Sequence, residues 1–148
     1  ESFKKWLTYV LTEIMRNIPE HSQANEIWYC AQYWPSYDLA ELAILDEGVG
    51  IKNSLLSNHA YDDLITNDFD ALKLSLRPGI SRTFAPGGVN LGDDEWRNSG
   101  YGLYMVSRLC EELGGSFIIA SGDSAIRLKS NKKVLGTIDV IFTGQESR

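Results

Sequence analysis

The stretch that most constrains the fold is a short apolar run that ends in an aspartate and two glycines. Residues Leu39 to Leu45 have the apolar content of a buried strand. Asp46 follows, and Gly48 and Gly50 come next with one residue between them. Glycine is favoured where the backbone takes a positive φ or where another group must approach it closely. The run therefore predicts a strand that ends in a tight turn, with a carboxylate at its tip.

The carboxylate of Asp46 needs a partner, because a carboxylate at the end of a buried strand is costly without hydrogen bonds. An ionised carboxylate only accepts hydrogen bonds, so an exocyclic amino group such as that of adenine suits it. The alternative is an ordinary β-turn, in which Asp and Gly are common for conformational reasons. This stretch by itself leaves both interpretations open.

The composition fits one folded domain and disfavours several functional classes. The chain has 148 residues, 43% of them hydrophobic and 23% charged, and this length allows a sizeable core. The net charge of -6 disfavours nucleic acid or an anionic membrane as a partner, because no basic excess is present to displace counterions from phosphates. No apolar run approaches the roughly 20 residues that a membrane helix needs.

The start of the chain and its cysteines favour a cytoplasmic protein. No signal peptide is visible, and the chain begins at Glu1 rather than Met, as expected of a piece of a longer protein. Cys30 and Cys110 lie far apart in apolar segments, so we expect two buried, reduced thiols. No group of Cys and His residues has the spacing of a zinc site.

The first segment, Ser2 to Ile18, has apolar side chains at helical spacing, and we expect an amphipathic helix there. Glu13 and Asn17 are four residues apart, so they lie on one side of that helix. The pair could be a general base beside a ligand for Mg²⁺, which prefers oxygen ligands, or simply a solvated polar surface. Pro19 disfavours helical geometry in the residue before it, so the helix kinks or stops before His21.

The rest of the chain predicts an α+β domain, a two-layer sandwich with helices on one face of a mixed, mostly antiparallel sheet. Its irregular segment, residues 57 to 98, is the length of a lid over a binding site, or else is an insertion without function. The expected elements are strands at 26–33, 39–45, 116–121, 125–129 and 137–142, a short helix from Lys52, a helix within 61–76 that Asn67 or Asp68 caps, and a helix from Leu103 to Gly114-Gly115.

The segment from Asn98 to Leu103 contains a Gly-x-Gly, at Gly100 and Gly102, immediately before the last helix. Backbone N–H groups and the positive end of the helix dipole meet at such a position, where a phosphate could bind. The alternative is a helix N-terminus that binds no ligand.

Together these segments resemble the ATP-binding domain shared by gyrase B subunits, the related heat-shock chaperones, histidine kinases and mismatch-repair ATPases, known as the GHKL or Bergerat fold. Residues 12–21 are similar to the N box of that family, and residues 46–51 to its first glycine box. Residues 100–103, with the helix that follows, are similar to its second glycine box. Gly136-Thr137 is similar to the Gly-Thr that closes the adenine pocket. The resemblance covers nearly the whole chain as one domain, 1–148, with an ATP lid at about residues 52–98.

The resemblance implies a role for each matching residue. Asp46 would accept a hydrogen bond from the adenine amino group, and Thr137 would assist through a water. Asn17 would ligate Mg²⁺, and Glu13 would orient or deprotonate the attacking water. In the lid, Arg77 or Arg82 could reach the γ-phosphate or be exposed to solvent. The implied nucleotide-binding residues are Asn17, His21, Asp46, Gly48, Gly50, Ile51, Ser99, Gly100, Tyr101, Gly102, Leu103 and Thr137.

Three functions agree with this resemblance. The first, which we expect because the lid is long enough to enclose a nucleotide, is an ATPase that uses Mg-ATP to drive or gate a conformational change. The second is a kinase, either of the anti-sigma serine type, to which the spacing of Glu13, Asn17 and His21 is similar, or a histidine-kinase catalytic domain. The third is a non-catalytic nucleotide sensor. Ile18 departs from the small residue usual after the asparagine, and no phosphoacceptor histidine is evident.

The expected partners are ATP and ADP, together with a protein partner or further domains of the same chain. No contact with nucleic acid or membrane is expected of this domain. Dimerisation, if it occurs, is expected to use regions outside these residues.

Overall fold

The computed structural model describes residues 2–17, 22–81, 101–112, 114–130 and 137–144. They form an α+β domain, as the sequence predicts, and most elements begin and end within two residues of the expected bounds. Short 3₁₀ turns lie at Pro35–Tyr37 and His59–Tyr61. The helices and strands are α1 (Ser2–Asn17), β1 (Ile27–Trp34), β2 (Leu39–Asp46), α2 (Gly50–Leu56), α3 (Asp68–Ser75), α4 (Gly102–Glu112), β3 (Ser116–Ser121), β4 (Ser124–Lys129) and β5 (Thr137–Gly144).

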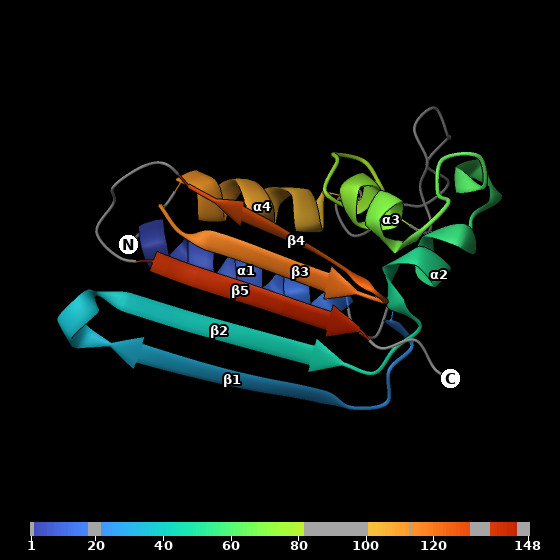
Figure 1. Ribbon diagram of the computed structural model, residues 1–148. Helices are drawn as coiled ribbons and strands as arrows, with labels where there is room; N and C mark the ends of the chain where they lie inside the picture. Colours follow the sequence, from blue (N-terminus) through green and yellow to red (C-terminus); the bar gives the residue numbers. More distant parts are fainter. Residues whose placement is uncertain (1, 18–21, 82–100, 113, 131–136, 145–148) are drawn as a thin grey trace.

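The strands form one sheet in the order β1-β2-β5-β3-β4. The antiparallel hairpins β1–β2 and β3–β4 are joined by β5, which runs parallel to both β2 and β3 (Figure 1). The sheet is mixed, as expected. The expectation that it is mostly antiparallel is wrong, because β5 adds two parallel pairings to the two antiparallel ones.

Local sequence explains where α3 and α4 begin or end. The side chain of Asn67 accepts a hydrogen bond of 2.9 Å from the backbone N–H of Asp70, which satisfies one donor of the first turn of α3. This confirms the predicted cap. After α4, Gly114 has a φ of +83°, and the N–H of Gly115 donates to the carbonyl of Cys110 at 2.8 Å. The glycine pair therefore ends the helix as the sequence predicts.

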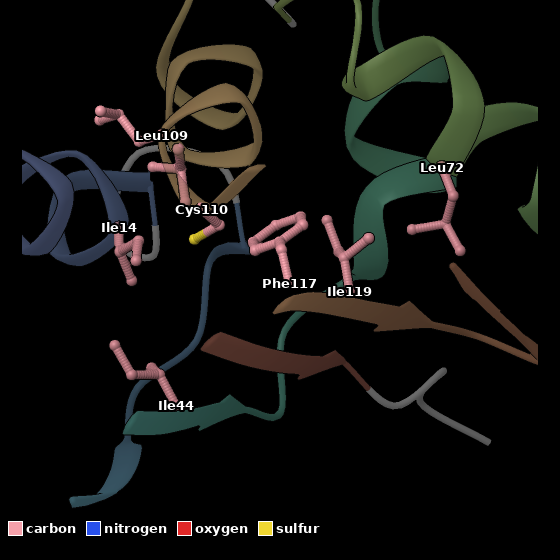
Figure 2. Close-up of a cluster of buried hydrophobic side chains, with 8 residues drawn as sticks. Ile14, Ile44, Leu72, Leu109, Cys110, Phe117 and Ile119 are labelled. Carbon is pink, nitrogen blue, oxygen red and sulfur yellow. The ribbon is translucent and has the colours of Figure 1, made fainter. Parts of the chain in front are cut away.

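The main hydrophobic core lies between the sheet and the helices α1, α3 and α4 (Figure 2). Ile119 is paired with residue 142 of β5, which is paired in turn with Ile44 of β2, so both isoleucines lie on the same face of the sheet. Ile14, Leu72 and Val106 pack onto that face from the three helices. The buried members of this cluster are Ile14, Ile44, Leu72, Val106, Leu109, Cys110, Phe117 and Ile119.

A second core lies within the segment that was expected to be a lid. The side chain of Tyr61 is fully buried, and it packs with residues of α2, α3 and the chain between them. Residues 52–81 of the expected lid therefore form a packed part of the domain that buries apolar side chains of its own. Residues 82–98 lie outside the described part of the chain. The cluster consists of Leu55, Tyr61, Ile65, Ala71, Leu74 and Ile80.

We expect Tyr61→Phe to lower the free energy of unfolding by about 1–2 kcal/mol. The phenolic O–H donates to the carbonyl of Ser81 at 3.1 Å inside this second core, and the substitution leaves that buried carbonyl without this donor. Denaturation in urea measures the change. Tyr37→Phe is the matched control, because Tyr37 is 79% exposed and its loss of a hydroxyl should leave stability within about 0.5 kcal/mol. Equal effects of the two substitutions would contradict this role of Tyr61.

Strand β1 is exposed along its whole length, because it is an edge strand that lies beyond the helices (Figure 1). Tyr29 is 74% exposed and Tyr33 is 54% exposed. The prediction of two buried thiols is therefore half wrong. Cys110 is buried in the main core, whereas Cys30 is exposed on β1.

Candidate functional site

Three segments expected to form a site, the end of α1, the turn after β2 and the start of α4, lie at one end of the sheet. Strands β2, β5 and β3 are parallel to one another, so Asp46 and Ser121 both lie where their strands end. Helix α1 starts at the opposite end of the sheet and runs toward this one (Figure 1). Helix α4 ends at Glu112, shortly before the start of β3, so its N-terminus at Gly102 also lies at the Asp46 end.

Asp46 shapes the turn that follows β2. Its Oδ1 accepts a hydrogen bond of 2.9 Å from the backbone N–H of Gly48, the Asx-turn geometry that Asp favours after a strand. The side chain is partly exposed. Among the described residues, Oδ2 makes no hydrogen bond or ion pair. Asp46 therefore fixes its own turn with one oxygen and presents the other as an acceptor.

The backbone conformation and packing of the chain require glycine at both Gly48 and Gly50. A Cβ at Gly48 would lie 2.2 Å from the carbonyl oxygen of Ser22, a distance that no real Cβ contact tolerates. That same carbonyl accepts the N–H of Val49 at 2.8 Å. Gly50 has a φ of +77°, which disfavours any other residue. The close approach that the sequence predicts at Gly48 is therefore an approach of the chain to itself.

Ser121 holds the start of α2 against the end of β3. Its Oγ accepts a hydrogen bond of 2.9 Å from the backbone N–H of Ile51. The side chain of Ile51 packs against both hydrophobic clusters and so connects the sheet to the segment that follows. This contact joins two segments 70 residues apart, and it fixes the orientation of the turn that carries Asp46. Neither Ser22 nor Ser121 carries a sequence signal that predicts these contacts.

Glu13 is buried on α1, one residue before the core residue Ile14. It is 7% exposed and forms an ion pair of 2.9 Å with Arg16 on the next turn of the helix. Burial raises the pKa of the Tyr9 phenol, and the negative charge of Glu13 raises it further. The positive charge of Arg16 opposes this shift. A carboxylate this far from water can act on a small molecule only if that molecule enters the site beside α1.

The N-terminus of α4 supplies backbone donors at the same end of the sheet. The helix has 11 residues and starts at Gly102, and the carbonyl of Tyr101 accepts the N–H of Met105 at 2.8 Å. Tyr101 is 45% exposed, and its ring meets that of Tyr104 edge to face. Leu103 packs against the main core and anchors this turn. The first turn of α4 is therefore held in place with its N–H groups at the Asp46 end.

The register of β5 separates Thr137 from Asp46. Thr137 is paired with Leu39 at the start of β2, whereas Asp46 is paired with Gly144. Seven residues of strand, or about 23 Å, separate the two positions. The expectation that Thr137 and Asp46 share one adenine pocket is therefore wrong in this structure, because the parallel pairing of β5 puts its first residue at the far end of the sheet.

The other expected site residues are described in part or not at all. Asn17 is the last residue of α1, and its backbone alone is described. Arg77 is exposed after the end of α3. His21, Arg82, Ser99 and Gly100 lie outside the described residues. Among the residues that are described, no group of three or more His, Cys, Asp or Glu side chains could hold a metal ion, and no helix combines the length and apolar character needed to cross a membrane.

Comparison of the chain with known proteins found no match. No family model matches the chain, and neither a curated protein nor a solved structure matches it.

Proposed function

We propose that this domain binds Mg-ATP at the end of the sheet where β2 ends, in the manner of a Bergerat-type domain, and hydrolyses it to drive or gate a change in a partner or in further domains. The observation that carries the proposal is the geometry of Asp46. One carboxylate oxygen is held by the N–H of Gly48, and the other is an acceptor at the site. An adenine amino group is a donor of the kind that such an acceptor recognises.

The phosphates would lie toward α4 in this proposal. Its first turn presents backbone N–H groups and the positive end of the helix dipole, which together favour a phosphate. Leu103 and Tyr104 hold that turn through the core packing and the aromatic contact described above. The phosphate subsite is thus assigned to Gly102 and the residues beside it.

Asn17 is the residue that would hold Mg²⁺. Its amide oxygen is a hard donor of the kind that Mg²⁺ accepts, and this cation usually keeps several waters and phosphate oxygens besides one or two protein ligands. The end of α1 lies at the Asp46 end of the sheet (Figure 1), which is compatible with that role. The bound cation would neutralise charge on the phosphates.

Glu13 is the residue proposed to act on the attacking water. It lies four residues before Asn17, about one turn of the helix. Burial strengthens its hydrogen bonds to a polar group that enters the site. The ion pair with Arg16, at 2.9 Å, fixes the orientation of the carboxylate.

The test of hydrolysis is phosphate release from labelled ATP by the parent protein and by Glu13→Gln. We expect release to fall by about 10²–10⁴-fold, the usual contribution of a general base, while ATP affinity changes little. Glu112→Gln, at the exposed end of α4, is the matched control and should release phosphate at the parent rate. Equal release by Glu13→Gln and the parent would contradict the role of Glu13. Transfer of label to a protein in cell extract, without free phosphate, would replace the ATPase proposal with a kinase.

A further inference from the structure

The exposed edge of β1 is the feature of the molecule that the proposed site does not use. β1 is one edge of the sheet, and no described strand pairs with its outer side. Its sequence, IWYCAQYW, contains no charged residue and no proline. Natural proteins usually protect an edge strand with charge, proline or a covering segment, because an unprotected edge pairs with another strand.

The opposite edge of the sheet is protected in the usual way. β4 carries Arg127 and Lys129, both exposed, and positive charges on an edge strand disfavour pairing with a second chain. Helix α3 also contacts β4. The two edges of one sheet therefore differ: β4 is charged and partly covered, whereas β1 is uncharged and exposed on both faces.

The aromatic residues of β1 are placed symmetrically about Ala31. Trp28 and Trp34 each lie three residues from Ala31 and share one face of the strand, while Tyr29 and Tyr33 each lie two residues away and share the other face. Tyr29 is paired with Ile44, so the tyrosines are on the helix side of the sheet and the tryptophans on its open side. A strand with this symmetry is complementary to an antiparallel copy of itself.

We propose that β1 pairs with β1 of a second copy of this chain, antiparallel and centred on Ala31, so that the two sheets become one continuous sheet. In this register Trp28 lies opposite Trp34 of the second copy on one face, and Tyr29 lies opposite Tyr33 of the second copy on the other. Aromatic pairs placed directly across two antiparallel strands stabilise such pairing. The two-fold axis passes through Ala31 perpendicular to the sheet, so each face of one sheet continues into the same face of the other.

Other registers lack this match. A register centred on Cys30 would place Trp28 opposite Gln32 and Tyr29 opposite Ala31 of the second copy, so the aromatic side chains would lose their aromatic partners. The aromatic side chains that this pairing would cover are strongly exposed: Tyr29 is 74%, Tyr33 54% and Trp28 44% exposed. The uncharged surface of β1 favours a second uncharged strand over a charged partner.

The first test is the mass of the full chain in solution, by light scattering over a wide range of protein concentration. We expect the parent to reach twice the monomer mass of 16.6 kDa. Ala31→Lys should remain at 16.6 kDa, because the two-fold axis would set two ammonium groups side by side. Ala31 is exposed, so the variant should keep the circular dichroism and unfolding midpoint of the parent. A parent that stays monomeric, or an Ala31→Lys variant that still dimerises, would overturn the proposal.

The second test fixes the register with a disulfide. In the register centred on Ala31, residue 32 lies opposite Cys30 of the second copy at a Cα separation of about 4.5–5.5 Å, which a disulfide can span. Mild oxidation of Gln32→Cys should therefore give a covalent dimer linked by Cys30 and residue 32. The matched control is the double variant Cys30→Ser with Gln32→Cys, whose remaining thiols lie diagonally, about 7–8 Å apart, and should not link. A parent that links through Cys30 alone would show a different register and overturn this one.

Discussion

Asp46→Asn is expected to lower the affinity for ATP by about ten- to one-hundredfold, the effect of losing one hydrogen bond to a charged acceptor and gaining a misplaced donor. The amide of asparagine can still accept the N–H of Gly48 through its own Oδ1, so the turn after β2 should persist. Its NH₂ group would face the adenine amino group as a second donor. Calorimetric titration with ATP measures the affinity, and urea denaturation reports whether the fold is unchanged.

The matched control for this substitution lies on the same hairpin. Asp38→Asn changes an exposed aspartate in the turn at the opposite end of β2, so it makes the same chemical change far from the proposed site. We expect ATP affinity in this variant to equal that of the parent. Equal ATP affinities in Asp46→Asn and the parent would contradict the proposal that Asp46 accepts a hydrogen bond from the adenine amino group.

Phe117→Ala is expected to lower the free energy of unfolding by about 3–5 kcal/mol, the range for removing a buried phenylalanine. The side chain is fully buried in the main core, where β3 faces α1 and α4 (Figure 2). A domain of this size has a total stability of about 5–15 kcal/mol, so the loss is a large part of it. Urea denaturation of the parent and of Phe117→Ala measures the difference in the free energy of unfolding, provided that both proteins show the same dependence of this free energy on urea concentration.

Phe69→Ala is the control for that substitution. Phe69 is 46% exposed on α3, and its ring lies 4.9 Å from the ammonium group of Lys73. Loss of this exposed contact should cost about 1 kcal/mol or less. Comparable losses in Phe69→Ala and Phe117→Ala would mean that the cluster around Phe117 is not the centre of the fold.

The secondary structure of the periodic segments follows from their sequence. Helix α4 forms where a helix is expected and buries Val106 and Cys110, which are four residues apart, and the strand before Asp46 ends where the apolar run ends. In both segments one face packs against the rest of the domain, so the tertiary structure agrees with the local pattern. The cap by Asn67 and the turn at Gly114 follow from local geometry in the same way.

The features that the sequence did not predict depend on tertiary structure, which no local pattern encodes. Tyr61 and Ile65 belong to a core assembled from several short elements, and no local pattern shows that these elements pack against one another. Cys30 is exposed because β1 lies at the edge of the sheet, and strand order is not visible in the sequence of one strand. Thr137 lies far from Asp46 because β5 pairs in parallel with β2.

At the candidate site, the sequence predicted the residues that form the turn but not why they are needed there. Gly48 is required because Ser22 lies against it, and this contact joins segments that are distant in sequence. Asp46 is the residue for which the sequence argument and the geometry agree, since it ends a strand and keeps an acceptor oxygen at the site.

The measurement that tests the central claim most directly is an amide NMR titration of the ¹⁵N-labelled domain with ATP and Mg²⁺. We expect resonances at the Asp46 end of the sheet to shift first, those of Gly48, Gly50, Ile51 and Gly102, while those of Leu39 and Thr137 at the opposite end stay in place. GTP, which has a carbonyl in place of the adenine amino group, should shift them less. An unchanged spectrum at saturating ATP, or shifts confined to the Leu39 end, would contradict the proposal that this domain binds ATP beside Asp46.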